Sequence, residues 1–131
     1  MEVEKVNYIS VLRDILKLNH EEIAAVSDDF ESINAYLEAH QIIIPDDFQV
    51  TLCNHINVML LRFKTNECAQ IEVNEDVYRQ VSKRSLDYAE ECLTPICRKY
   101  GILLNQAEKV LFAIYLQTGI SKEDGSCQIN Q

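Results

Sequence analysis

The sequence is poor in the residues that build turn-rich folds. Its 131 residues include three glycines, two prolines and no tryptophan. A β-sheet needs a turn between most of its strands, and glycine and proline are the usual turn residues, so long helices are favoured. No apolar run approaches the roughly 20 residues that cross a bilayer. We therefore expect an all-α protein that does not enter a membrane.

The motifs of the common enzyme classes are also missing. The sequence has no G-x-S-x-G, no phosphate-binding loop, no G-x-G-x-x-G and no H-E-x-x-H. His20 and His40 have no evident partners and are interpreted as surface or capping residues. Potential metal ligands do not cluster, and the five cysteines form no C-x-x-C pair. We expect no enzyme activity, no metal and no cofactor.

Negative charge is concentrated in the first part of the chain. The net charge is -9, and residues 1–50 hold eleven acidic against three basic residues. Such a surface repels phosphate backbones, which argues against direct nucleic-acid binding and favours a protein partner with a basic surface. The chain begins without the basic and apolar regions of a signal peptide, and its odd cysteine count indicates reduced thiols. Both observations predict a cytoplasmic protein.

Apolar side chains recur at three- and four-residue steps along most of the chain, the period of amphipathic helices. The predicted helices are 3–18, 20–39, 47–65, 76–99 and 105–118. Asn19 with Glu22, and Asn105 with Glu108, have the spacing of capping boxes. Pro95 lacks a backbone donor and should kink or interrupt the fourth helix.

These helices predict one domain built as an antiparallel bundle of about five helices. It spans residues 1–131, with an extra N-terminal helix within 1–19, the bundle over 20–120 and a flexible tail over 121–131. The short apolar run 42–44 is interpreted as a buried connection, because no strand partner is evident. The longest internal loop is expected over 66–75.

The third predicted helix carries the most distinctive pattern. Leu52, Ile56 and Phe63 belong to its buried stripe, and His55 lies on the flank of that stripe. Arg62 follows His55 by seven residues, which is about 20° short of two full turns, so both side chains share one face. They remain about 10 Å apart along the axis. Taken alone, His55 is interpreted as an ordinary half-buried side chain.

The segment 52–62 reads L-x-x-H-I-x-x-x-L-x-R. It closely resembles the first histidine motif of the PTS regulation domain (PRD), which occurs in bacterial antiterminators and operon activators controlled by the sugar phosphotransferase system. Further parts of the family pattern follow in the family's order: Tyr88-Ala89, Gly101 and Asn105 to Glu108. The resemblance implies an all-α bundle that forms homodimers. It also implies that His55 accepts a phosphoryl group from a phosphocarrier or a sugar-permease component.

The chain departs from the family pattern in three ways. Asn54 stands where the family often has aspartate before the histidine. Tyr115 occupies the place of the family's second histidine, within 113–116. There is also one copy of the domain and no room for a nucleic-acid-binding module, so the chain resembles a stand-alone PRD protein.

Two hypotheses follow from these residues. In the first, phosphorylation of His55 lets the protein modulate transcription or a partner protein. In the second, the chain is a phosphorylation-incompetent interaction or dimerisation module, in which Tyr115 hydrogen-bonds His55 and holds it in place. Arg62 is interpreted either as the partner of the phosphate or as the partner of a carboxylate such as Glu90 or Glu91.

Overall fold

The computed structural model describes residues 8–66 and 75–120. These ranges contain helices and no strand. The elements are α1 (Tyr8–Ser10), the π-helical segment η1 (Val11–Ile15), α2 (His20–Ala39), α3 (Asp46–Lys64), α4 (Glu75–Gln80), α5 (Lys83–Lys99) and α6 (Gln106–Gly119). The all-α prediction is confirmed for the described part of the chain. No helix there is both long enough and apolar enough to span a bilayer.

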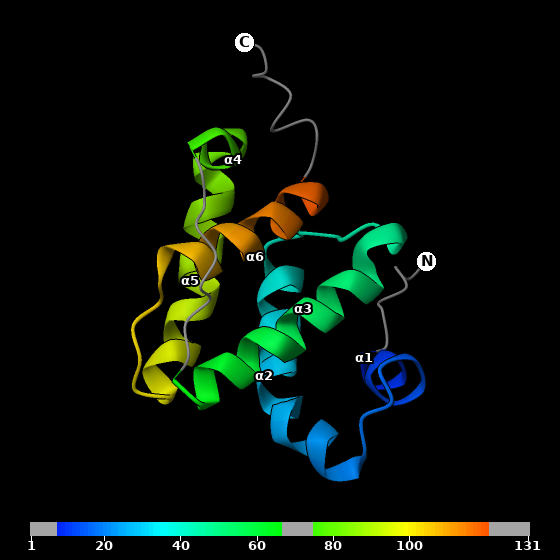
Figure 1. Cartoon of the computed structure of the whole chain (residues 1–131). Coiled ribbons are helices and arrows are strands. Elements are labelled where there is room, and N and C mark those ends of the chain that lie inside the picture. The colour runs from blue at the N-terminus through cyan, green and yellow to red at the C-terminus, as the bar shows by residue number, and fades with distance from the viewer. Residues whose placement is uncertain (1–7, 67–74, 121–131) are drawn as a thin grey trace.

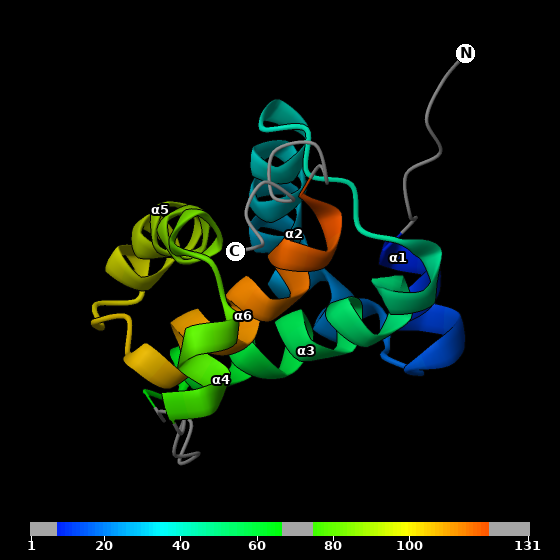
Figure 2. The ribbon, with the colours of Figure 1, turned by 90° about the horizontal axis from the view of Figure 1, so that it is seen from above.

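The four longest helices form two crossing layers. In Figure 1, α2 and α5 stand upright, while α3 and α6 slant across them. Figure 2 shows the same arrangement from above, with α5 seen nearly end-on and α3 running across the view. The core lies between the layers, where it includes side chains that are at most 1% exposed: Phe30, Ile33, Met59, Leu60, Leu93, Val110, Phe112 and Leu116.

Polar contacts show that neighbouring helices run antiparallel. Between α2 and α5, Asp29 contacts Lys99, and Tyr36 contacts Glu91. Between α5 and α6, the ammonium of Lys109 lies 3.2 Å from the Glu90 carboxylate, while the Ser85 hydroxyl lies 3.3 Å from the Gln117 side-chain oxygen. In both pairs the residue number rises on one helix as it falls on the other. The predicted antiparallel packing is therefore present in the described helices.

Capping explains where α2 and α6 begin. The Asn19 side chain accepts a hydrogen bond from the Glu22 N–H, and the Glu22 carboxylate accepts one from the Asn19 N–H, both at 2.8 Å. This is the predicted capping box. At α6 the Asn105 side chain accepts from the Glu108 N–H at 2.8 Å. The Glu108 side chain, however, turns away to another helix, so only half of the second predicted box forms.

The long helix predicted over 76–99 is wrong at one point, because α4 ends at Gln80 and α5 begins at Lys83. Ser82 caps α5 by accepting a hydrogen bond from the Ser85 N–H at 3.0 Å. Gln117 of α6 bridges the break, accepting from the Ser82 N–H at 2.6 Å and donating to the Gln80 carbonyl at 2.8 Å. The apolar period continues across this break, so periodicity alone did not reveal it.

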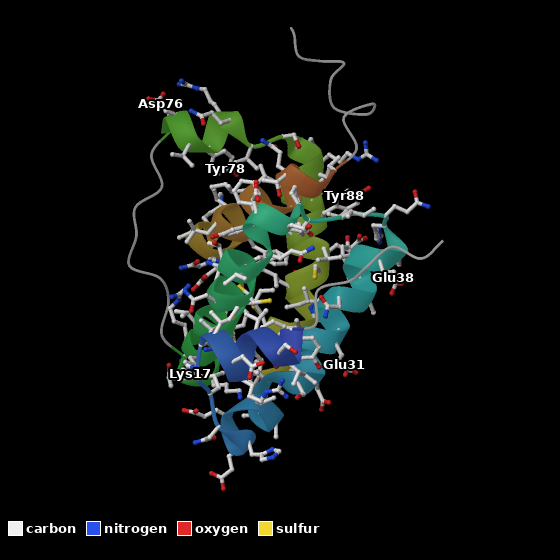
Figure 3. All side chains as sticks on the ribbon, turned by 90° about the vertical axis from the view of Figure 1, so that its right-hand side faces the viewer. Lys17, Glu31, Glu38, Asp76, Tyr78 and Tyr88 are labelled. Carbon is white, nitrogen blue, oxygen red and sulfur yellow. The ribbon has the colours of Figure 1, made fainter. Side chains whose placement is uncertain are left out.

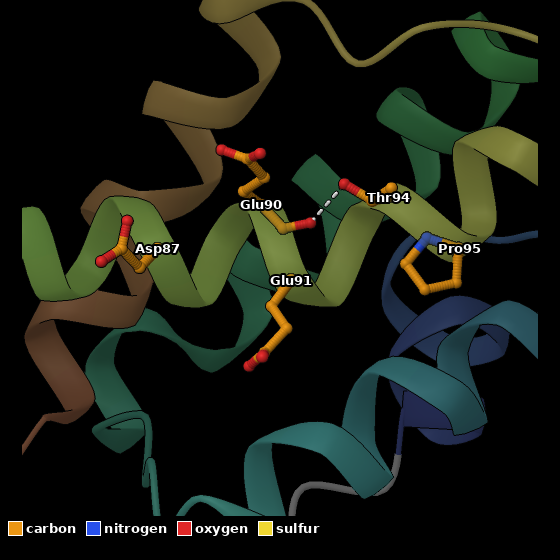
Figure 4. Close-up of a pocket in the computed structure, with 5 residues that line it drawn as sticks. All are labelled: Asp87, Glu90, Glu91, Thr94 and Pro95. Carbon is orange, nitrogen blue, oxygen red and sulfur yellow. Dashed lines mark hydrogen bonds between the residues drawn. The ribbon is translucent and has the colours of Figure 1, made fainter.

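Pro95 does not interrupt the helix that contains it, since α5 continues to Lys99. The preceding Thr94 hydroxyl donates to the Glu90 carbonyl at 2.6 Å, as Figure 4 shows. A shallow hollow of about 460 Å³ lies here along α5, lined by Asp87, Glu90, Glu91, Thr94 and Pro95.

The helix predicted over 3–18 is shorter in the described range. Residues 1–7 lie outside that range, and the helical turns end at Ile15. The Leu16 N–H bonds to the Val11 carbonyl at 2.9 Å, a five-residue step that widens the turn. Lys17 then adopts a φ of 63°, which ends the helix. Tyr8 stacks on Phe30 of α2 with ring centroids 4.8 Å apart, and so attaches this segment to the bundle.

The connection at 42–44 is not a strand. Ile42 and Ile44 are buried while Ile43 is 58% exposed. The Ile43 N–H donates to the Gly119 carbonyl at 3.1 Å. A Cβ at Gly119 would lie 2.7 Å from the Ile43 carbonyl oxygen, so only glycine allows the end of α6 to approach so closely. The other two loop predictions, 66–75 and the tail 121–131, lie almost entirely outside the described residues.

Most acidic side chains of the first half lie at the surface. Glu38 of α2 is exposed on the outside of the molecule in Figure 3, as is Asp76 of α4 from the second half of the chain. Asp29 is the exception, because its side chain is 3% exposed. It accepts from the Lys99 ammonium and the Tyr100 hydroxyl, both at 2.5 Å. This carboxylate joins α2 to the end of α5.

We expect Asp29→Asn to lower the free energy of unfolding by about 2 kcal/mol, since the amide loses the charge-assisted bonds to Lys99 and Tyr100. Urea denaturation followed by circular dichroism measures the change. Asp28→Asn is the matched control, because Asp28 is the exposed neighbouring carboxylate, and it should change stability by less than about 0.5 kcal/mol. Equal losses of stability in both variants would contradict a stabilising role for the contacts of Asp29 with Lys99 and Tyr100.

Candidate functional site

His55 lies in the seam between α3 and α6. Its ring packs against the Tyr115 ring, with centroids 5.3 Å apart and planes tilted by 37°. Both side chains are partly exposed. The structure thus brings together the two residues that the sequence placed at the family's first and second histidine positions.

The Nε2 atom of His55 is buried and has no hydrogen-bond partner among residues 8–66 and 75–120. The hydrogen bond predicted from Tyr115 is therefore not made to this nitrogen, and the two rings contact each other only by packing. A buried, unpaired nitrogen costs free energy and is uncommon in folded proteins. The imidazole thus packs against α6, but its Nε2 atom makes no hydrogen bond to the described residues of that helix.

Arg62 lies on the same face of α3 and pairs with Glu108 of α6. Its Nε lies 2.5 Å and its Nη2 lies 2.9 Å from the two carboxylate oxygens, a bidentate ion pair. Glu108 is 2% exposed, while the Arg62 side chain is 23% exposed. Part of the Arg62 side chain is therefore open to solvent, while the carboxylate of Glu108 is nearly closed to it.

Arg62 has a carboxylate partner, but the two carboxylates named as examples, Glu90 and Glu91, are the wrong ones. Glu90 pairs with Lys109, and Glu91 accepts the Tyr36 hydroxyl instead. The sequence pattern predicts for Glu108 only a capping role. A signal for its second role exists in the spacing: Tyr115 follows Glu108 by seven residues, as Arg62 follows His55. On two antiparallel helices, equal seven-residue spacings bring both pairs into contact at once.

Burial and two neighbouring charges act on the pKa of His55. Burial lowers the pKa of His55 below its usual value of 6.5; the Glu108 carboxylate raises it and the Arg62 guanidinium lowers it further. The net shift is downward, which keeps the ring neutral at pH 7. A neutral imidazole carries the lone pair that a nucleophile needs.

The remaining predicted residues lie away from this seam contact. Asn54 is exposed on α3 and follows Cys53, which is buried. His20 is the exposed first residue of α2, and His40 is its C-cap, stacked on Tyr36 with centroids 4.1 Å apart. In residues 8–66 and 75–120, no three histidine, cysteine or acidic side chains are grouped to hold a metal ion.

The lowered pKa of His55 predicts a pH dependence of stability. As pH falls through 6.5, the unfolded chain takes up a proton before the folded one, so stability present above pH 6.5 is lost below it. Between pH 7.5 and 5.5, urea denaturation should show the wild type losing more stability than His55→Gln, by at most about 1.4 kcal/mol per pH unit. His20 and His40 are common to both proteins and cancel. Parallel stability curves would contradict the burial of the His55 ring.

Comparison with known proteins identifies the fold. A family model described as the PRD domain matches residues 30–118, more than half of the chain. No curated protein and no solved structure matches the chain. The matched range contains the whole seam, from His55 and Arg62 on α3 to Glu108 and Tyr115 on α6. The chain therefore belongs to the PRD domain family, a family of regulatory modules linked to the sugar phosphotransferase system.

Proposed function

We propose that this chain is a bacterial regulatory protein in which His55 accepts a phosphoryl group from the phosphotransferase system. The phosphorylated protein then modulates transcription or a partner protein. The observation that carries this proposal is the seam itself: a neutral, partly exposed imidazole lies on one helix face with a guanidinium seven residues away. The L-x-x-H-I motif supports the same role.

The chemistry needs no separate base. A lone pair of the neutral His55 ring attacks phosphorus while the bond from phosphorus to the donor atom breaks. The electron pair of the broken bond stays with the donor, which takes up through water the proton that His55 gives up. The donor is a phosphocarrier or a sugar-permease component. No metal or organic cofactor is part of this step.

The second element of the proposal is a homodimer formed through the outer face of α3. Val50, Val58 and Leu61 are exposed there at 38%, 38% and 51%, and they share this face with Asn54. Apolar side chains exposed along one helix favour contact with another protein surface. Because His55 adjoins this face, a new charge on the ring would act on such a dimer.

The proposal places the protein in the cytoplasm, where it meets the phosphocarrier. Direct nucleic-acid binding is not part of it, because the net charge of -9 opposes approach to a phosphate backbone. Control of transcription would pass through a protein partner with a basic surface.

A specific observation favours the alternative function, an interaction or dimerisation module without the switch. Nε2 of His55 is buried against its surroundings and Tyr115 covers the ring. Phosphorylation of that nitrogen requires the seam to open. In the alternative the seam never opens, and His55 contributes only to packing.

Phosphotransfer separates the two functions. The chain is incubated with a phosphoenolpyruvate-driven phosphocarrier system and its intact mass is measured at alkaline pH, because phosphohistidine is acid-labile. We expect one added phosphate on the wild type and on His40→Ala, and none on His55→Ala. His40 is the control because it is another partly buried histidine. Equal labelling of all three proteins would exclude His55 as the acceptor, and no labelling would favour the alternative.

The dimer is tested by substitution on the α3 face. In sedimentation velocity, the wild type should form dimers and Leu61→Asp should be monomeric, because a charge would be buried in the contact. Leu103→Asp is the matched control and should stay dimeric, since Leu103 is 90% exposed in the loop before α6. A monomeric wild type, or a dimeric Leu61→Asp, would overturn this element of the proposal.

A further inference from the structure

Glu108 stands at the centre of the seam without a part in the function proposed so far. It is almost fully buried, at 2% exposure, and its two oxygens hold the Nε and Nη2 of Arg62. Its backbone N–H is bound separately by Asn105. The carboxylate is thus free of the capping role that its position in α6 predicted, and it is used entirely for Arg62.

His55, Arg62 and Glu108 form one electrostatic unit. The charged groups that act on the His55 ring are the carboxylate of Glu108 and the guanidinium of Arg62. In the unmodified protein the two charges compensate each other beside a neutral ring. A phosphoryl group would add about one and a half to two negative charges to this unit.

Such a charge cannot be accommodated with the ion pair unchanged. Two anions would then share a single guanidinium, and one of them, Glu108, lies in a site almost closed to water. The new negative charge would lie on the same seam as this carboxylate, and like charges repel more strongly in a site of low dielectric than in water. Arg62 has the greater freedom, because its side chain is 23% exposed and its planar fork binds phosphate as well as carboxylate.

We propose that Glu108 is a positioning residue of the His55 site: it holds Arg62 on the face of α3 that carries the unmodified ring, and a phosphoryl group on His55 replaces it as the partner of Arg62. The inference rests on the proposed phosphorylation of His55. The exchange releases the Glu108 carboxylate from α3 and weakens the attachment of the first turns of α6. A negative charge added to α3 thereby allows α6 to move.

The exchange is tested on the Arg62 side chain itself. In nitrogen-edited NMR spectra at pH 8, the Nε–H of an arginine held by an anion is protected from exchange with water. We expect a protected Arg62 signal in the unmodified wild type, its loss in Glu108→Gln, and its return when Glu108→Gln is phosphorylated. A merely structural role for Glu108 would not restore the signal. A signal that stays absent after phosphorylation would overturn the proposal.

Stability gives the second readout. Phosphorylation should lower the urea midpoint of the wild type by roughly 0.5–1 M at 10 °C, because it leaves Glu108 buried without its cation. The same phosphorylation should leave the midpoint of Glu108→Gln unchanged or raise it. Glu90→Gln is the matched control. Glu90 also forms an ion pair between two helices, with Lys109, but its side chain is 60% exposed. The urea midpoint of Glu90→Gln should therefore respond to phosphorylation like that of the wild type. Equal responses in all three proteins would contradict the exchange.

Two further variants keep the inference separate from the proposed function. If no phosphate is incorporated, the phosphorylation proposal fails, and His55→Glu supplies the negative charge directly. His55→Glu should then lower the urea midpoint more in the wild-type background than in Glu108→Gln, and equal losses would overturn the inference by itself. If Glu108→Gln does not fold, Glu108→Met takes its place, because it also removes the charge and has a side chain of similar length.

Discussion

The ion pair between Arg62 and Glu108 is the contact on which the site depends. It fixes the register of α3 against α6, because the bidentate geometry allows one relative position of the two helices. Once that register is set, Tyr115 must lie beside His55, because Tyr115 follows Glu108 by seven residues on α6 and His55 precedes Arg62 by seven residues on the antiparallel α3. The same pair decides which charges surround the imidazole. Packing, register and electrostatics of the seam therefore have a single physical origin.

A buried carboxylate also makes the contact between α2 and the end of α5. Asp29 fastens α2 to the end of α5 through Lys99 and Tyr100, just as Glu108 fastens α6 to α3. Each carboxylate is nearly closed to water, while its basic partner retains exposed area. Such pairs contribute little net stability compared with apolar packing, but they penalise any other register. The apolar core holds the bundle together, and the two carboxylates select how its layers align.

Membership of the PRD domain family suggests what the contact between α3 and α6 is for. A regulatory module needs an element whose arrangement changes with a chemical signal. In this chain the candidate signal is charge on His55, and the candidate element is α6, which is attached to α3 through one ion pair and apolar packing. Tyr115 in place of a second histidine leaves His55 as the one candidate acceptor in the seam, so the proposed response depends on a single modification. The exposed apolar face of α3 adjoins that acceptor and offers a surface through which the response could reach a second chain.

The sequence by itself determined the helical class, the capping of α2 and the face of α3 that carries His55 and Arg62, because these follow from local periodicity and local hydrogen bonds. It also identified Tyr115, through the family resemblance. Tertiary structure alone decided the break at Ser82, which Gln117 of α6 stabilises across 35 residues, and the partner of Arg62, which lies 46 residues away. The sequence around Glu108 fits a capping box whether its carboxylate bonds to the backbone of Asn105 or to the side chain of Arg62. The carboxylate binds Arg62 because the packed helices bring that cation near it, and no local pattern contains that information.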